Sequence, residues 1–323
     1  MKVVYLGPLA RDLVRESLAG SSFDVLSAEA DSNLEEILSD ASVLVTTGPM
    51  YTPKAAAAAK AAKNLKLIQL TSAGFDSIEK FGAPPGTSIC NAAQAWSIAV
   101  AEHAMAMMLA LGRRIVDAIR LQQERQWQRA YAVLCRSMYG STLLIVGYGR
   151  IGKQIARRAK SFSMKVIAVS SESDKDEYVD EIAGIDELHA ALGRADTVVA
   201  AVPSTPRTVN MFDAAAFACF KHGALFINVA RGDVVHAEAL EAALREGRLG
   251  GAAIDVAVPE PLPANSSLWT TPNLIITPHV AGAVPDLVPL HIRDVVVENL
   301  HRLASGKPLK NLLAFDRGVS PAS

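Results

Sequence analysis

The sequence predicts an α/β protein with two doubly wound parallel sheets, and three observations lead to this prediction. Short apolar segments alternate with alanine-rich, helix-like segments along the chain. The alternation occurs in two series, which a long helix-like segment over residues 95–125 separates. The second series opens with a strand, a glycine-rich turn and a helix, an order typical of the first unit of such a sheet.

The first series predicts five strands, with helical segments between the earlier ones. Each strand is a short apolar run, as expected of a strand that is buried in a parallel sheet. The helix at residues 53–63 begins with Pro53, which suits the first position of a helix. The five expected strands cover residues 3–7, 23–28, 43–47, 65–70 and 88–90.

The second series predicts six strands and is followed by a last helix over about residues 285–305. Because no strand of the second series follows this helix, we expect it to return to the first domain. The six expected strands cover residues 142–147, 165–170, 197–203, 224–229, 251–256 and 274–278.

Composition narrows the expected partners and compartment. The 32 Lys and Arg residues balance 33 Asp and Glu residues, so we expect neither a nucleic-acid nor a membrane partner. The most apolar helix-like stretch is interrupted by Glu102 and His103, which argues against a membrane span. The N-terminus has no signal pattern, and Cys90, Cys135 and Cys219 lack metal-ligand spacing. We therefore expect a cytoplasmic protein with no metal site, in which all three thiols are reduced and act as small core residues.

The glycine-rich turn reads Gly-Tyr-Gly-Arg-Ile-Gly and lies between a strand and a helix. In such a turn Gly147 permits the sharp bend, Gly149 lets the backbone approach a pyrophosphate, and Gly152 lets the helix pack closely on the strand. The N-terminal end of the helix that follows favours a bound anion. With the flanking strand and helix, the motif predicts a dinucleotide-binding site.

Polar residues follow three later strands of the second series, at the edge where open α/β sheets bind ligands. Arg231 can clamp a carboxylate, His279 can donate a proton near neutral pH, and Glu260 can orient an imidazole. Each of them alone has an ordinary explanation as a surface or loop residue. The other six histidines have no comparable surroundings in the sequence.

Five blocks in this order resemble the D-isomer-specific 2-hydroxyacid dehydrogenase family. They are LTSAGFDSIE (70–79), GYGRIG (147–152), INVARGDVVHAEAL (227–240), AAIDVAVPEPLP (252–263) and TPHVAG (277–282). The resemblance implies a flavodoxin-like substrate domain of residues 1–94 and 284–323, and an inserted Rossmann domain of residues 95–283. It also implies a homodimer that associates through the long helical segment.

The resemblance assigns roles to individual residues. It implies that His279 is the acid/base, that Glu260 is its paired carboxylate and that Arg231 binds substrate. Backbone N–H groups of Ala73 and Gly74 would bind the substrate carboxylate. The cofactor-binding residues that it implies are Gly147, Gly149, Arg150, Ile151, Gly152, Ser170, Ser171, Val202, Pro203, Thr208, Ala230, Asp255 and Gly282.

The implied activity is the reversible, NAD(P)H-dependent reduction of a small 2-oxo acid of the glyoxylate or hydroxypyruvate type to the D-2-hydroxy acid. Thr46 stands where phosphoglycerate dehydrogenases carry an arginine, which disfavours a phosphate ester. Met50 and Tyr51 either line the substrate pocket or pack within their loop. Two alternatives remain open: a phosphoglycerate dehydrogenase-like activity, and a non-catalytic NAD(H)-binding protein of the corepressor type.

Two serines bear on the choice of cofactor. Ser170 and Ser171 stand where an NAD-specific unit usually has Asp or Glu, the side chain that binds the ribose and repels a 2′-phosphate. Their hydroxyl groups, with those of Ser173 and the ammonium of Lys175, can donate to a phosphate, so NADP(H) is favoured over NAD(H). Acidic residues at 172, 174 and 176 oppose this preference unless they point away.

Overall fold

The computed structural model describes residues 1–171 and 175–313 of the chain. The chain divides into two compact units, unit 1 (Met1–Trp96 and Val284–Ser323) and unit 2 (Ser97–Ala283). The boundaries predicted from the sequence lie after residues 94 and 283, and the observed ones lie after residues 96 and 283. Glu172, Ser173 and Asp174 of the serine-rich stretch lie outside the described residues.

Unit 1 contains a five-stranded parallel sheet in the order β2-β1-β3-β4-β5. This is the doubly wound order of flavodoxin-like domains, so the predicted fold of this unit is confirmed. In the sheet, Val4 of β1 lies opposite Leu26 of β2 on one side and opposite Leu44 of β3 on the other. The strands are β1 (Lys2–Leu6), β2 (Asp24–Ala28), β3 (Val43–Thr46), β4 (Leu67–Leu70) and β5 (Ser88–Cys90).

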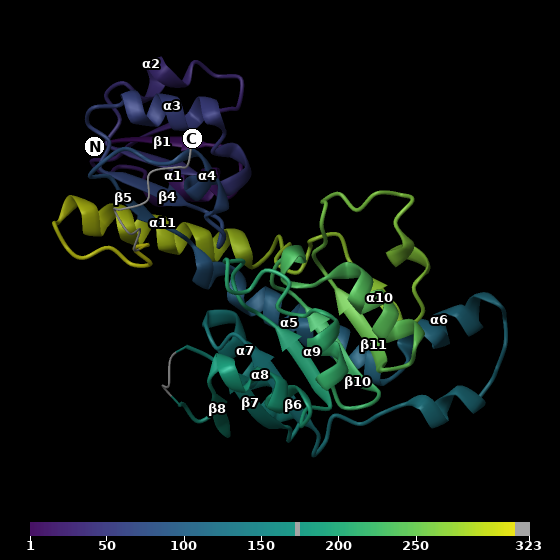
Figure 1. Ribbon diagram of the computed structural model, residues 1–323. Coiled ribbons are helices and arrows are strands. Elements are labelled where there is room, and N and C mark those ends of the chain that lie inside the picture. Colours follow the sequence, from purple (N-terminus) through teal and green to yellow (C-terminus); the bar gives the residue numbers. More distant parts are fainter. Residues whose placement is uncertain (172–174, 314–323) are drawn as a thin grey trace. The chain divides into compact units, whose positions relative to one another are not determined.

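Helices cover both faces of this sheet. Figure 1 shows α11 on one face and α2 and α3 on the other, and α1 contacts α11. The last helix therefore packs on the first domain, as expected from the sequence, and its buried Asn299 donates to Gln69 of β4 at 2.7 Å. The helices are α1 (Arg11–Ser17), α2 (Leu34–Leu38), 3₁₀ turn η1 (Gly48–Met50), α3 (Pro53–Ala61), α4 (Asp76–Phe81) and α11 (Val288–Ala304).

Unit 2 contains a seven-stranded parallel sheet in the order β12-β11-β10-β9-β6-β7-β8. The chain winds outward in both directions from the adjacent β6 and β9, which is the Rossmann order and confirms the predicted fold. Strand β8 was not predicted from the sequence, and its first residue, Glu181, is charged. The strands are β6 (Thr142–Val146), β7 (Lys165–Val169), β8 (Glu181–Ala183), β9 (Thr197–Ala200), β10 (Ala224–Asn228), β11 (Leu249–Ile254) and β12 (Leu274–Ile276).

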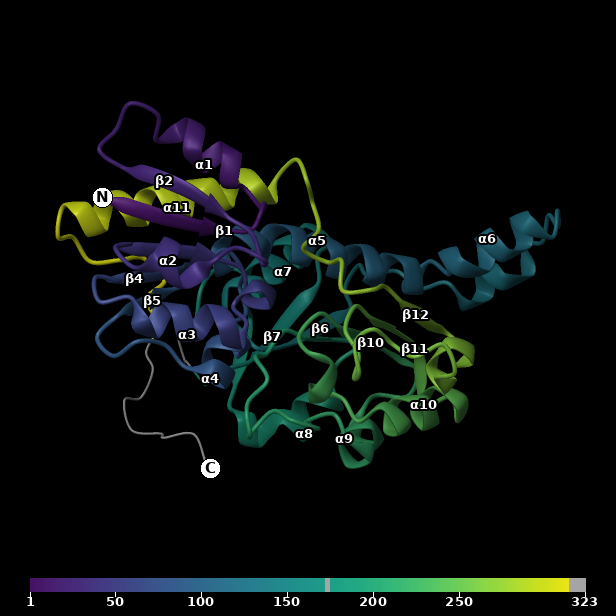
Figure 2. The ribbon, with the colours of Figure 1, turned by 90° about the horizontal axis from the view of Figure 1, so that it is seen from above.

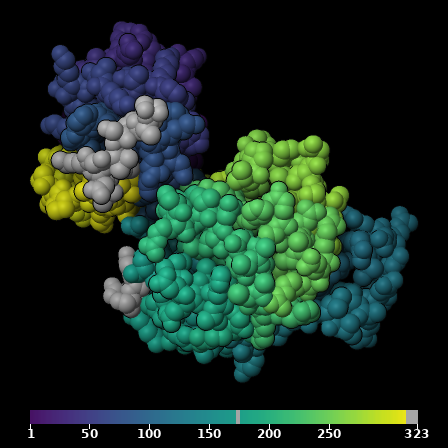
Figure 3. Space-filling view, in the orientation of Figure 1, coloured from purple at the N-terminus to yellow at the C-terminus, as the bar shows by residue number. Residues whose placement is uncertain are grey.

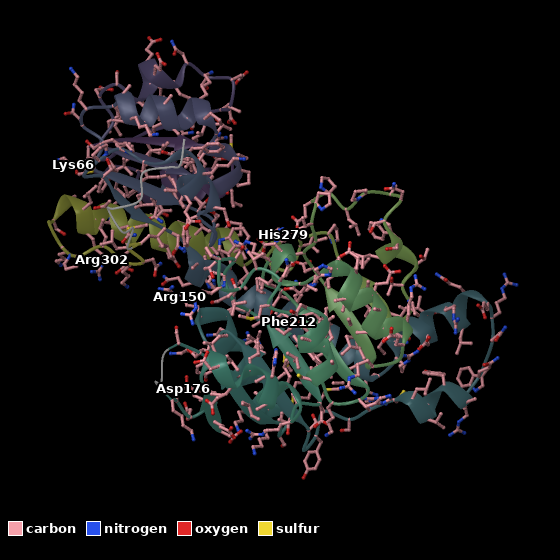
Figure 4. All side chains as sticks on the ribbon, viewed as in Figure 1. Lys66, Arg150, Asp176, Phe212, His279 and Arg302 are labelled. Atoms are coloured by element: carbon pink, nitrogen blue, oxygen red, sulfur yellow. The ribbon has the colours of Figure 1, made fainter. Side chains whose placement is uncertain are left out.

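Two apolar layers pack against the sheet of unit 2. One joins buried residues of α5 and α7 to one face, and the other joins α8, α9 and α10 to the opposite face. The second layer is centred on four phenylalanines, among which the rings of Phe212 (labelled in Figure 4) and Phe226 are 4.8 Å apart. These helices are α5 (Ala93–Gly112), α7 (Arg150–Ser161), α8 (Leu188–Leu192), α9 (Ala214–Cys219) and α10 (Ala237–Arg245).

The long helical segment predicted over residues 95–125 is not continuous, which corrects the sequence prediction. It breaks between α5 and α6 (Ile115–Gln123), where Arg114 has a φ of 54°. A side chain at Gly112 would collide with the end of Met138, and the Gly112 carbonyl accepts a hydrogen bond from the Arg136 N–H at 2.7 Å. This contact ends α5 and turns the chain into an arm that projects from unit 2 (Figures 2 and 3).

Among the described residues, α5 is the one helix long and apolar enough to cross a membrane, judged by length and composition alone. Glu102 and His103 interrupt its apolar run but not the helix. Its buried residues, such as Ala104 and Met108, pack in the core of unit 2, and buried core helices commonly have this composition.

Candidate active site

The glycine turn of unit 2 has the local geometry that a dinucleotide requires. Gly147 has a φ of 103°, and a Cβ atom there would lie 2.5 Å from the Ala201 carbonyl oxygen. A Cβ at Gly152 would lie 2.2 Å from the Gly147 oxygen, so helix and strand touch at this point. A Cβ at Gly149 would meet nothing within 4 Å, which leaves this side of the turn open. The residues present therefore fit a pyrophosphate at the N-terminus of α7, where Arg150 and Ile151 form the first turn.

The tip of β7 lies next to a small polar cluster that the sequence did not reveal. The Tyr148 hydroxyl donates to Asp176 Oδ1 at 2.6 Å, and the Tyr178 N–H donates to the same oxygen at 2.9 Å. Burial and then the bond to Asp176 raise the pKa of the Tyr148 phenol above its usual value. The Asp176 carboxylate is therefore engaged by the glycine turn. Ser170 donates its N–H to the Ala183 oxygen at 3.1 Å, which holds it at the end of β7.

Lys175 and Ser171 complete the described part of this stretch. The Lys175 ammonium donates to the Asp180 carbonyl oxygen at 2.5 Å, so it is already engaged by a backbone acceptor. Ser171 is exposed. The structure thus orients the charges of Lys175 and Asp176 in a way that sequence spacing alone did not predict.

The structure brings His279 and Glu260 together. His279 Nδ1 lies 2.8 Å from Glu260 Oε2, and the other carboxylate oxygen of Glu260 accepts the Ala257 N–H at 3.0 Å. Both side chains are about half exposed, so water and a ligand can reach them. The Nδ1–carboxylate contact leaves Nε2 as the ring atom that can exchange a proton with a ligand. His279 itself is labelled in Figure 4.

Asp255 fixes the loop that carries His279. Its carboxylate is 4% exposed and accepts hydrogen bonds from the N–H groups of Val280 and Ala281, each at 2.9 Å. It also accepts the Thr277 hydroxyl at 2.6 Å. Three hydrogen bonds to the Asp255 carboxylate, at the end of β11, therefore hold the loop that runs from Thr277 to the predicted cofactor residue Gly282.

His103 is a member of this network that the sequence did not reveal. Its Nε2 lies 3.0 Å from Thr277 Oγ1 and 3.7 Å from Asp255 Oδ1. His103 and Thr277 are 174 positions apart, so no local pattern could have joined them. Nothing in the sequence singled out His103, whereas the structure places it beside the buried carboxylate of Asp255.

Arg231 lies directly after β10, beside the ends of the strands that carry Asp255 and His279. The Asn228 side chain holds this turn: its Nδ2 donates to the Arg231 carbonyl at 2.9 Å, and its Oδ1 accepts the Ala230 N–H at 3.0 Å. The Arg231 guanidinium donates to the Ala230 oxygen at 2.8 Å. A close contact of Gly232 with the Ala257 backbone brings the β10 and β11 loops together.

The loop after β9 is held by its own hydroxyl groups. Thr208 Oγ1 donates to the Pro203 oxygen at 2.7 Å and accepts the Thr205 N–H at 2.8 Å. Ser204 donates to Asp233 at 2.6 Å, which ties this loop to the one that carries Arg231. Val202 lies against the glycine turn, since a Cβ at Gly147 would approach its Cγ1 to 2.9 Å.

In unit 1 the predicted carboxylate-binding residues Ala73 and Gly74 lie in the loop after β4. Within the described part of the chain, neither of their N–H groups donates a hydrogen bond to the protein. The carbonyl groups of the same loop are all engaged by neighbouring donors. Such a loop offers donors to an anion.

Tyr51 does not line a pocket. Its side chain is 0% exposed, and its hydroxyl donates to the Gly82 oxygen at 2.9 Å. Burial raises the pKa of this phenol to about 12. Met50 is partly buried against the core of unit 1, and its sulfur lies beside Gly7. Of the two readings left open by the sequence, packing within the loop is therefore the one that Tyr51 adopts.

Within residues 1–171 and 175–313, no three or more His, Cys, Asp or Glu side chains form a group that could hold a metal ion. The proton-transfer and anion-binding groups described above are all side chains or backbone N–H groups of the chain itself.

Comparison with known proteins identifies the class. Residues 105–281 match the family model described as "D-isomer specific 2-hydroxyacid dehydrogenase, NAD binding domain". A solved structure of a D-isomer specific 2-hydroxyacid dehydrogenase family protein from Aeromonas salmonicida superimposes with a TM-score of 0.86 and 31% identity, covering 98% of this chain and 99% of that one. The chain belongs to the D-isomer specific 2-hydroxyacid dehydrogenase family, a family of oxidoreductases, and unit 2 contains its NAD-binding domain.

Curated relatives within the family carry different substrate names. A glycerate dehydrogenase from Methylorubrum extorquens is 35% identical, with 79% of this chain and 81% of that protein covered. A glyoxylate reductase from Pyrococcus furiosus is 33% identical, with 80% and 75% covered. A D-3-phosphoglycerate dehydrogenase from Synechocystis is 32% identical, with 97% of this chain covered. The chain spans only 57% of the length of that relative.

One further solved structure bears on the cofactor. A D-isomer specific 2-hydroxyacid dehydrogenase from Xanthobacter autotrophicus, described as a complex with NADPH and MES, superimposes with a TM-score of 0.83 and 27% identity. The superposition covers 97% of this chain and 98% of that one.

Proposed function

We propose that this protein reduces a small, unphosphorylated 2-oxo acid, of the glyoxylate or hydroxypyruvate type, to the D-2-hydroxy acid, and catalyses the reverse reaction. The observation that carries the proposal is the contact between His279 Nδ1 and Glu260 Oε2. It orients a proton donor at the strand ends of an NAD-binding domain, where this family requires an acid/base.

When bound at the turn from Gly147 to Gly152, NAD(P)H would supply the hydride for the carbonyl carbon of the 2-oxo acid. Protonated His279 gives the proton on Nε2 to the carbonyl oxygen as negative charge develops there, which completes the hydroxyl group. Glu260 holds the imidazole ring through Nδ1. Arg231 binds and polarises the substrate, and the N–H groups of Ala73 and Gly74 bind its carboxylate.

The absence of a charged side chain at position 46 supports an unphosphorylated substrate. Thr46 is fully buried at the end of β3, and its hydroxyl donates to the Thr47 carbonyl oxygen. A phosphate ester would need a cation near this position, and Thr46 supplies none. The glycerate dehydrogenase and glyoxylate reductase relatives, which the chain covers over most of their length, also favour this substrate class.

We infer a preference for NADP(H) over NAD(H). The side chain at the tip of β7 is the neutral Ser170, so no carboxylate at this position repels a 2′-phosphate. The Asp176 carboxylate, which would oppose a phosphate, is engaged by Tyr148 and by the Tyr178 N–H. The structural relative described in complex with NADPH is consistent with this preference.

We further propose that the protein is a cytoplasmic homodimer that associates through the arm of residues 113–139. The arm exposes a set of large apolar side chains, of which Trp127 is 97% exposed. An apolar surface of this kind is typical of an interface. The exposed side chains are Ile115, Val116, Ile119, Trp127, Val133, Leu134 and Tyr139.

The experiment that tests the activity is a steady-state comparison of glyoxylate, hydroxypyruvate, pyruvate, 3-phosphohydroxypyruvate and phenylpyruvate, each with NADPH and with NADH. We expect the highest kcat/KM with glyoxylate or hydroxypyruvate and with NADPH. The highest value with the phosphorylated substrate would support the phosphoglycerate dehydrogenase alternative. Cofactor binding without turnover of any substrate would support the non-catalytic alternative.

A further inference from the structure

The loop that carries Ala73 and Gly74 has four consecutive carbonyl groups, and each accepts a hydrogen bond. Those of Thr71 and Ala73 accept from the side chains of Trp96 and Asn91 respectively, both at 2.8 Å. The other two complete the row: the Ser72 oxygen accepts the Ala92 N–H at 3.0 Å, and the Gly74 oxygen accepts the Ser72 hydroxyl at 2.8 Å.

These bonds determine where the N–H groups of the loop point. A peptide unit is planar, so holding the carbonyl of one residue also holds the N–H of the next. The bond from Asn91 to the Ala73 oxygen therefore orients the Gly74 N–H. The bond from the Ala92 N–H to the Ser72 oxygen orients the Ala73 N–H in the same way.

Trp96 holds the base of the loop. It lies in the first turn of α5, and its indole N–H reaches the Thr71 carbonyl at the point where the chain leaves β4. On the other side, the Thr71 N–H donates to the Thr46 oxygen at 2.8 Å. Thr71 is therefore held through both of its backbone polar groups, and the loop starts from a fixed position.

Each of the two side-chain hydrogen bonds has one buried partner, the donor Asn91 in one and the acceptor residue Thr71 in the other. Asn91 is 5% exposed and Thr71 is 1% exposed, so water cannot readily take the place of a lost donor. A buried carbonyl that loses its donor is destabilised unless the backbone moves to find another. Movement of this loop would change the direction of the two N–H groups that face the substrate.

We propose that Asn91 and Trp96 are positioning residues for the substrate carboxylate: they hold the 71–74 loop so that the N–H groups of Ala73 and Gly74 converge on one anion. This inference rests on the proposed function. Neither side chain touches the reacting atoms in the proposed reaction. Their replacement should weaken binding of the 2-oxo acid and leave binding of the cofactor to unit 2 unchanged.

The test uses Trp96→Phe and Asn91→Ala in the full chain, with Trp269→Phe as the matched control. Trp269 also donates its indole N–H to a carbonyl, that of Pro263 at 2.9 Å, but it is half exposed and lies in unit 2. For the first two variants we expect the KM for glyoxylate to rise about 5- to 30-fold, with the KM for NADPH unchanged. We expect Trp269→Phe to retain both values.

Calorimetric titration with oxalate, a non-reacting dicarboxylate, tests the inference without turnover. We expect the oxalate Kd of the NADPH-loaded protein to rise by the same factor in both variants. Unchanged oxalate binding in both, or equal increases in the KM values of glyoxylate and NADPH, would overturn the positioning role. If the unmodified protein binds oxalate in this manner but reduces no 2-oxo acid, the proposed reaction fails while the positioning of the anion stands.

Discussion

The backbone N–H of His279 donates a hydrogen bond of 2.7 Å to the carbonyl oxygen of Asp255. His279 has a φ of 54°, a conformation that a residue other than glycine rarely adopts without support from its surroundings. The support comes from the end of β11, through the backbone and carboxylate of Asp255. The position of the proposed acid/base is therefore set by Asp255 at the end of β11 together with the loop of His279 itself, where the Thr277 oxygen lies 3.1 Å from the same N–H.

Replacing the proposed proton donor tests the centre of the mechanism. We expect His279→Ala to lower kcat with glyoxylate by about 10²- to 10⁴-fold, because the developing alkoxide loses its proton donor. The Kd of NADPH, measured by fluorescence titration, should stay within about twofold of the unmodified protein, since the glycine turn is untouched. Retention of full turnover in this variant would contradict the assignment of His279.

The buried carboxylate of Asp255 gives a prediction about stability. In Asp255→Asn an amide N–H₂ replaces one of the oxygens that accept N–H groups from Val280 and Ala281. We expect the free energy of unfolding to fall by about 1–3 kcal/mol, measured by urea denaturation. We also expect kcat to fall, because the loop that carries His279 loses its anchor. A variant as stable as the unmodified protein would show that this network contributes little to the loop.

The cofactor preference can be tested at the tip of β7. We expect Ser170→Asp to lower kcat/KM with NADPH by at least about tenfold, because the new carboxylate repels the 2′-phosphate. The value with NADH should be retained or rise, since Asp can accept hydrogen bonds from the ribose. Ser171→Asp, one position further along, serves as a comparison. If Ser170→Asp left the ratio of the two kcat/KM values unchanged, Ser170 would not face the ribose.

The three cysteines should differ in reactivity. Cys90 is fully buried in β5, and burial raises the pKa of its thiol to about 12, whereas Cys135 and Cys219 are partly exposed. Because the thiolate is the reactive form, we expect iodoacetamide at pH 8 to modify the latter two first. Peptide mass spectrometry should find Cys90 modified only after denaturation. Early modification of Cys90 in the folded protein would contradict its burial.

An ion pair in unit 2 predicts how stability depends on pH. Burial tends to raise the pKa of Asp196, but hydrogen bonds from the Lys221 ammonium and the Thr142 N–H outweigh it and lower the pKa. Its contribution is therefore present above the unfolded-state pKa of about 4 and is lost as the pH falls through the lower folded-state value.

We expect Asp196→Asn to lower the free energy of unfolding at pH 7 by no more than about 1 kcal/mol, since both side chains are partly exposed. The difference from the unmodified protein should shrink below pH 4. A difference of the same size at pH 3 and at pH 7 would mean that it does not come from the carboxylate charge. Urea denaturation at the two pH values measures it.

The sequence by itself was sufficient to predict the structural features that depend on residues close together in the chain. The strand β6, the turn from Gly147 to Gly152 and the helix α7 are one contiguous segment, and their pattern predicted their structure. The pairing of His279 with Glu260 also followed from the sequence, through its resemblance to a known family. These signals are strong because apolar periodicity and glycine spacing act within a few residues.

Tertiary structure decided the features that depend on residues far apart. The break after α5 follows from the contact of Gly112 with Met138 and Arg136, and neither partner is part of the helical pattern. The hydroxyl group of the buried Tyr51 donates to the oxygen of Gly82, which is 31 positions away. The place of His103 beside Asp255 required α5 to pack on the sheet.

The same distinction separates the two parts of the candidate site. The sequence was sufficient to name the groups proposed to donate protons and hydrogen bonds to the substrate, because each of them is a residue type at a fixed place in a short motif. Only the tertiary structure decided how they are held: Asp255 fixes the His279 loop, and Asn91 and Trp96 fix the 71–74 loop. A hydrogen bond has a direction as well as partners, and direction exists only once the folded backbone has placed the donor and the acceptor.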